Sequence, residues 1–165
     1  MDKGGAFVSN RRRGFSLIEL LVVVAIMSVL ASIGFPLAEL SHRRMQEEEL
    51  RRSLREIRSA LDAYKRMSDA GLIARPAGGS GYPPNLQVLV DGEINAQTPQ
   101  AEKLYFLRRI PRDPLAPDSV QNAADTWTLR SYDSPPDDPR PGKDVYDVYS
   151  KAEGKGLDGR AYRQW

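Results

Sequence analysis

A single carboxylate at the edge of a long apolar run is the residue of this chain best placed to do chemistry. The sequence reads RRRGFSLIELLVVVAI over residues 11–26, and Glu19 is its acidic residue. A charged side chain at the boundary of an apolar segment is expensive unless it is paired, so it is a functional candidate by default. Two interpretations are open. Glu19 pairs with a cation, or it reaches unpaired toward lipid headgroups.

The composition excludes most other site chemistry. The chain has 165 residues, no Cys and one His, His42, which excludes disulfides, thiolate catalysis and Cys-based metal sites. A GxGxxG pattern occupies residues 154–159, but a nucleotide-binding motif needs a following helix and the chain ends shortly after it. With one remote His and no conspicuous pair of carboxylates, we expect no enzyme.

The apolar run that follows Glu19 is long enough to cross a bilayer. Residues 20–38 carry no charge and include only Ser28 and Ser32 as hydroxyl residues. At about 1.5 Å per residue, a helix of this length covers roughly 28 Å, the thickness of a hydrocarbon core. The run exceeds the 7–15 apolar residues of a cleaved secretory signal. Gly34 and Pro36 lie within it, so a kink or local melting is expected there.

The helix is expected to continue beyond the run with one apolar face. Leucine, isoleucine and tyrosine recur at spacings of four and three residues, which predicts an amphipathic helix packed on a core. These positions are Leu50, Leu54, Ile57, Leu61 and Tyr64. Two pairs at i,i+4, Glu47 with Arg51 and Glu48 with Arg52, are expected to stabilise the helix surface. One helix over residues 15–70, capped by Gly71, is therefore predicted.

The remaining residues predict a small domain with short elements. Pro and Gly indicate loops over residues 75–84 and 133–142. Short helices are expected over residues 85–90, stopped by Asp91-Gly92, and around residues 101–109. Residues 126–132 and 144–150 are rich in β-forming residues and predict strands. The tail, residues 151–165, reads as an irregular closing loop. The fold class is therefore α+β, with the long helix packed against a small C-terminal domain that contains an antiparallel sheet and irregular loops.

The N-terminal segment resembles the class III signal of type IV pilins and type II secretion pseudopilins. Basic residues, Gly14, the aromatic Phe15, a hydroxyl residue, two aliphatic residues and Glu19 precede a span, as in that family. The resemblance implies a type IV pilin-like fold, cleavage after Gly14 by a prepilin peptidase and methylation of the new N-terminal Phe15. It also implies that Glu19 of one subunit neutralises the new amine of a neighbour, whose ordinary pKa is about 7.7–8.0.

The C-terminal part is similar to the major pseudopilin of type II secretion. The resemblance rests on Tyr82-Pro83-Pro84, residues 110–114 and 145–150, Leu157-Asp158-Gly159 and the terminal Trp165. In that subfamily a C-terminal loop often binds calcium, and Asp158 matches an acidic ligand position. The later acidic ligand is missing here, and Arg160 and Arg163 oppose a bound cation. Calcium takes about 6–8 oxygens, so we expect no required cofactor and a loop held by hydrogen bonds and Trp165, with Ca²⁺ at Asp158 as the alternative.

The resemblance implies a structural subunit with four segments. These are a leader (residues 1–14), a transmembrane and filament-core helix (15–40), an amphipathic helix (41–70) and a periplasmic domain (71–165). The precursor would sit in the inner membrane as a single-pass protein. After processing it would polymerise with itself and other pseudopilins, on an inner-membrane assembly platform driven by a separate ATPase, to move exported proteins.

Two other functions remain open from the sequence. A pilin of a type IV or DNA-uptake pilus would need a basic surface, which Arg108, Arg109, Arg112, Arg140 and Lys143 could supply. A membrane-anchored domain that never polymerises is the other.

The net charge of +2 gives no reason to expect nucleic acid as a partner. Residues 1–14 hold four basic residues and one acidic residue; without them the chain keeps 20 basic and 21 acidic side chains, a net charge of −1. The basic balance therefore belongs to the leader.

Overall fold

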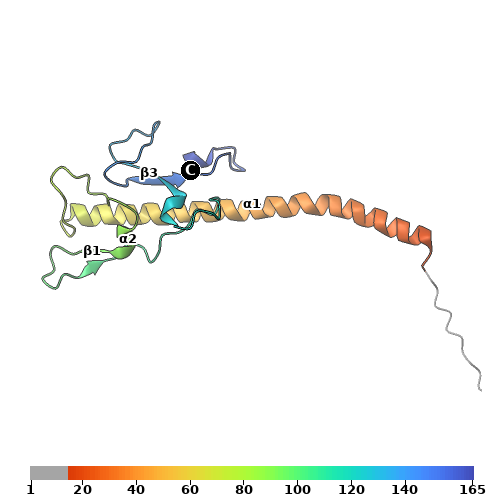
Figure 1. Ribbon diagram of the computed structural model, residues 1–165, viewed down its shortest axis with the longest axis horizontal. Helices are drawn as coiled ribbons and strands as arrows, with labels where there is room; N and C mark the ends of the chain where they lie inside the picture. Colours follow the sequence, from red (N-terminus) through yellow and green to blue (C-terminus); the bar gives the residue numbers. More distant parts are fainter. Residues whose placement is uncertain (1–14) are drawn as a thin grey trace, which may run out of the picture. The chain divides into compact units, whose positions relative to one another are not determined.

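The computed structural model describes residues 15–165, except for the side chains of residues 33–36. It divides into two units between His42 and Arg43. Helix α1 (Leu17–Asp69) supplies nearly all of the described part of the first unit and the first element of the second (Figure 1). Small antiparallel sheets follow it. The α+β class and the single long helix are both confirmed.

Helix α1 ends at Asp69, one residue before the predicted end, and Gly71 follows it as the predicted cap. This residue has φ +74°, the left-handed conformation that glycine adopts without strain. Its N–H donates to Ser68 O at 3.1 Å, and the N–H of Leu72 donates to Met67 O at 2.9 Å. These two bonds form a Schellman motif, which satisfies carbonyls that the end of the helix leaves free.

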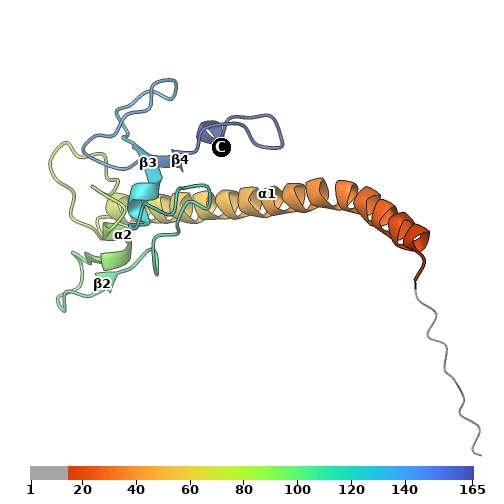
Figure 2. The same ribbon diagram turned by 45° about the vertical axis from the view of Figure 1, so that its right-hand side comes forward.

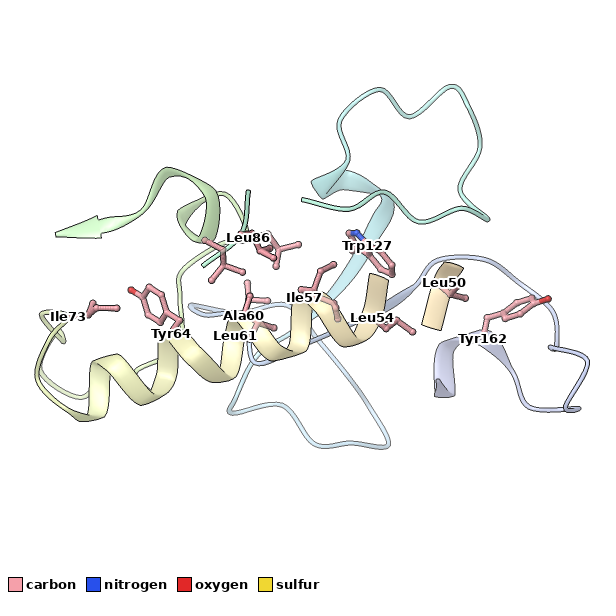
Figure 3. Close-up of a cluster of buried hydrophobic side chains, with 14 residues drawn as sticks. Leu50, Leu54, Ile57, Ala60, Leu61, Tyr64, Ile73, Leu86, Trp127 and Tyr162 are labelled. Carbon is pink, nitrogen blue, oxygen red and sulfur yellow. The ribbon is translucent and has the colours of Figure 1, made fainter. Parts of the chain in front are cut away.

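The predicted apolar face of α1 is the centre of the core in the second unit. Leu50, Leu54, Ile57, Leu61 and Tyr64 are all buried, with no more than 5% of any residue exposed. Figure 3 shows their side chains along the helix, with Leu86 and Trp127 directed toward it. Full burial of each such side chain contributes about 1.5–3 kcal/mol, so this face holds the small sheets on the helix.

The segment after α1 forms one short helix and a short ribbon. Helix α2 (Val88–Asp91) begins three residues later than the helix predicted over residues 85–90 and includes Asp91, and Gly92 ends it with φ +76°. The helix expected around residues 101–109 is wrong. That segment contains strand β2 (Lys103–Leu104), which pairs antiparallel with β1 (Glu93–Ile94). The N–H groups of Phe106 and Leu107 both donate to Leu89 O, so contacts with α2 replace helical bonds.

The two longer strands form a second antiparallel sheet, as predicted. Strand β3 (Trp127–Arg130) follows the 3-10 helix η1 (Ala124–Thr126) and pairs with β4 (Asp147–Ser150), with Trp127 opposite Ser150. Both sheets lie beside the C-terminal half of α1 (Figures 1 and 2). The chain closes with the 3-10 helix η2 (Tyr162–Gln164).

Asp144 anchors the long connection between β3 and β4. Its Oδ1 accepts hydrogen bonds from Ser131 Oγ at 2.7 Å and from the N–H of Tyr132 at 2.8 Å. Burial by itself would raise the pKa of Asp144, but hydrogen bonds from Ser80, Tyr132 and Ser131 outweigh it and lower the pKa below its ordinary value. The ionised carboxylate is therefore part of the folded structure.

We expect this carboxylate to make stability depend on pH under acid conditions. Because its folded pKa is lowered, its contribution is present above the unfolded pKa of about 3.9 and is lost as pH falls through the folded pKa. The free energy of unfolding should therefore fall less steeply below about pH 4 in Asp144→Asn than in the wild type. Urea unfolding of the full chain at several pH values measures this. Asp133→Asn is the matched control at an exposed aspartate, and equal slopes in Asp144→Asn and the wild type would contradict the prediction.

Candidate processing and assembly site

The structure places two of the three predicted N-terminal site residues. Gly14 lies outside the described residues. Phe15 is 80% exposed just before α1, and Glu19 lies exposed in the first turn of the helix. A carboxylate in a first turn interacts favourably with the helix dipole. Among residues 15–165, no ion pair includes Glu19.

The N-terminal part of α1 presents an unpartnered apolar surface. The helix contains a segment long and apolar enough to cross a membrane, and none of that segment is buried within the chain. Its large apolar side chains are 45–77% exposed at Leu17, Ile18, Leu20, Leu21, Val22, Val23, Val24, Ile26, Met27, Val29 and Leu30. A continuous apolar surface of this kind marks contact with lipid or with other proteins.

The two serines in this segment are compatible with an apolar environment. Ser28 Oγ donates to Val24 O at 2.7 Å, and Ser32 Oγ donates to Ser28 O at 2.8 Å. Both hydroxyls therefore satisfy their donors within the helix and need no water. The helix runs through Gly34 and Pro36, and the kink expected at these two residues stays a prediction.

At the other end of the chain, the candidate calcium ligand Asp158 lies among hydrogen-bond donors. Its Oδ2 is 2.9 Å from Arg51 Nη2, and its Oδ1 accepts the N–H of Arg160 at 3.0 Å. Within residues 15–165 there is no group of three or more His, Cys, Asp or Glu side chains suited to a metal ion. The described surroundings of Asp158 therefore supply positive charge and not the several oxygens that calcium takes.

The structure also corrects the two ion pairs expected along α1. Arg51 pairs with Asp158 and not with Glu47, and among the described residues no ion pair joins Glu48 and Arg52. Glu47 is instead buried, with 6% exposed, and accepts hydrogen bonds from Leu157 and Tyr162. Contacts of Glu47 and Arg51 with the C-terminal loop therefore replace the predicted Glu47–Arg51 pair.

Sequence reasoning missed the role of Glu47, although a signal was present. Glu47 precedes Leu50 by three residues and Leu54 by seven, which places it on the apolar face of the helix. A carboxylate at such a position is buried only if hydrogen-bond donors meet it. The spacing could have indicated a buried acid, but it could not have identified the donors.

The basic residues that a DNA-binding pilin would use are partly committed to other contacts. Arg112 donates to the carbonyls of Val120 and Pro117, and Arg140 pairs with Asp138. These contacts hold loops of the chain in place and do not favour a nucleic-acid surface.

Comparisons with known proteins agree with the N-terminal motif and extend the similarity to about two thirds of the chain. A family model described as the prokaryotic N-terminal methylation motif matches residues 9–35. A protein named Type II secretion system core protein G, from Klebsiella pneumoniae, is 31% identical over 115 residues, which cover 66% of this chain and 73% of that protein. Proteins of the same name from Klebsiella michiganensis and Dickeya chrysanthemi are each 29% identical over 111 residues, covering 65% of this chain and 70% and 65% of theirs. No solved structure gives a significant match.

Proposed function

Because this chain belongs to the family of type II secretion system core protein G, a family of pseudopilins, we propose that it is processed after Gly14 and polymerises into a pseudopilus. The observation that carries the proposal is one constellation. A methylation motif over residues 9–35 leads into a helix whose first half is apolar and unpartnered. This combination of motif and helix is typical of a subunit that is first inserted into a membrane and then assembled into a filament.

The exposed helix supports polymerisation on physical grounds. Once a subunit leaves the bilayer, its apolar side chains must be covered, because burial of apolar surface contributes about 25 cal/mol per Å². Bundling the N-terminal helices of many subunits covers this surface without lipid. The serine hydroxyls of the segment are already satisfied, so such a bundle buries no unpaired hydroxyl donor.

Glu19 supplies the proposed register between subunits. Processing would create an amine on Phe15, four residues before Glu19, and that amine would enter the same apolar bundle. An unpaired charge there is strongly unfavourable, whereas a carboxylate from the neighbouring subunit neutralises it. The exposed position of this carboxylate in the first turn of α1 supports this role.

The proposed partners follow from the same steps. They are a prepilin peptidase, the lipid bilayer, further copies of this chain, other pseudopilins and an inner-membrane assembly platform. The second unit would lie in the periplasm and form the filament surface, where extension would drive export of proteins. The basic residues that a DNA-uptake pilin could use gain no support from the structure, so a DNA-uptake pilus is not proposed.

The processing step can be tested directly on the protein in membranes. Coexpression with a prepilin peptidase should give a chain that begins at N-methyl-Phe15, and Gly14→Val should leave nearly all of the chain at its full length. Intact-mass and N-terminal sequence analysis distinguish the two. Gly4→Val, at another glycine of the leader, is the matched control and should be processed normally. Recovery of the uncut chain despite active peptidase would overturn the proposal.

A further inference from the structure

We propose that α1 itself closes the C-terminal loop, residues 151–165, through Glu47 and Arg51, so that the loop folds without a metal ion. The resemblance to major pseudopilins implies calcium in this loop. The side chains around the loop do not fit a calcium ion. They hold the loop on α1 by hydrogen bonds and an ion pair instead. This inference concerns the second unit alone and does not depend on the proposed polymerisation.

Three charged side chains, one from each of three successive turns of α1, contact the C-terminal loop, and their charges alternate in sign. Arg43, Glu47 and Arg51 are spaced four residues apart, so they lie one above another on one face of the helix. Arg43 donates to Lys155 O at 2.5 Å, and Arg51 donates to Asp158 Oδ2 at 2.9 Å. The arginines thus take a carbonyl and a carboxylate, the kinds of acceptor that a calcium ion would bridge.

Glu47 completes the contact from the middle turn. Its Oε1 accepts the N–H of Leu157 at 2.9 Å and the hydroxyl of Tyr162 at 3.0 Å, and its Oε2 lies 3.2 Å from the same N–H. Arg43 Nε is 3.5 Å away. A buried carboxylate is tolerated when donors surround it, and bonds to a charged acceptor are about twice as strong as neutral ones. At this position the loop therefore presents hydrogen-bond donors to Glu47, whereas a metal ion would need oxygen acceptors.

The terminal tryptophan packs into the same arrangement. The guanidinium of Arg51 lies 4.2 Å from the centroid of the Trp165 ring, and that ring meets Tyr162 edge-on at 5.1 Å. A Cβ on Gly156 would lie 2.2 Å from the Trp165 ring, so only glycine allows this approach. Arg58 donates to Trp165 O at 2.7 Å. A cation at Asp158 would have to displace the guanidinium that holds both the carboxylate and the ring.

Hydrogen exchange of the loop amides in the full chain, held in detergent micelles, tests the proposal. Wild-type exchange in residues 154–165 should agree within about twofold between EDTA and about 1 mM CaCl₂, a concentration sufficient for weak extracellular calcium sites. Arg51→Gln should speed exchange about threefold to thirtyfold, the combined effect of losing an exposed ion pair and a cation–π contact. Arg52→Gln, at the adjacent exposed arginine, is the matched control and should not change it.

Two further variants separate loop closure from general unfolding. Glu47→Gln should speed loop exchange more than Arg51→Gln does, while peptides covering residues 50–64 keep their protection in both. Asp158→Asn keeps the acceptor for Arg160 but loses the charge. In combination with Arg51→Gln it should add less than a further twofold, because both changes break the Arg51–Asp158 pair. The second ion pair of Asp158, with Arg160 Nε at 3.6 Å, involves an exposed arginine and contributes little.

Several results would overturn the proposal. Calcium that slows wild-type loop exchange tenfold or more relative to EDTA would show a metal-dependent loop. Wild-type exchange rates in Arg51→Gln, or fully multiplicative effects of Arg51→Gln and Asp158→Asn, would show that the pair does not close it.

Discussion

Chains that carry Glu19→Ala are expected to be processed normally and yet to fail to assemble. The variant removes the carboxylate that would neutralise the amine of the neighbouring Phe15. Breaking a buried ion pair by removing one partner costs about 3–5 kcal/mol, which corresponds to a loss of assembled subunits of about a hundredfold or more. The ratio of filament to membrane-bound subunit, measured after shearing and sedimentation of cells that express the full set of pseudopilins, gives this effect.

Glu39 provides a matched control for this experiment. It is a second exposed glutamate in the same unit of the chain, and it lies just beyond the uncharged run. Glu39→Ala removes the same charge and volume and should leave assembly close to the wild-type level. Wild-type amounts of filament from Glu19→Ala would contradict the pairing, and absence of filament from the wild type would favour a membrane-anchored domain that does not polymerise.

The second large effect is expected at Trp127 in the core of the second unit. Its side chain is 2% exposed, and its Nε1 donates to Pro111 O at 2.8 Å. Trp127→Ala leaves a cavity in the cluster of buried side chains that includes Ile57 (Figure 3). It also removes the donor to the carbonyl of Pro111. Such substitutions lower the free energy of unfolding by about 3–5 kcal/mol. For a domain of this size, that is a large part of the total stability.

Urea unfolding of the full chain, followed by pulse proteolysis, measures the loss. Trp127→Phe keeps an aromatic ring but removes the donor, so its effect should lie between those of the wild type and Trp127→Ala. Tyr105→Ala is the control at a ring that is 65% exposed and should change stability by less than about 0.5 kcal/mol. A loss below about 1 kcal/mol in Trp127→Ala would show that the ring does not organise the core.

The elements that were predicted correctly are those whose pattern is local. The stripe from Leu50 to Tyr64 repeats with the helical period, and Gly71 ends the helix because its left-handed backbone lets the last carbonyls be satisfied. The prediction of a helix around residues 101–109 was wrong because the structure of this segment depends on distant contacts. Ala101 has φ +52°, which is incompatible with a helix, and the N–H groups of Phe106 and Leu107 bond to Leu89. Contacts outside the segment decided its structure.

The sequence was enough to predict a long helix with an apolar half and an amphipathic half, and to identify the N-terminal motif. Hydropathy, helical period and short motifs are properties of neighbouring residues, so they can be recognised without a structure. The contacts of Glu47, Arg51 and Asp158 became clear only in the folded chain. One donor to Glu47 is the N–H of Leu157, 110 residues further along the chain, and Asp158 is 107 residues from Arg51. No local pattern encodes a contact across such a separation, because it depends on how the whole C-terminal loop packs on the helix.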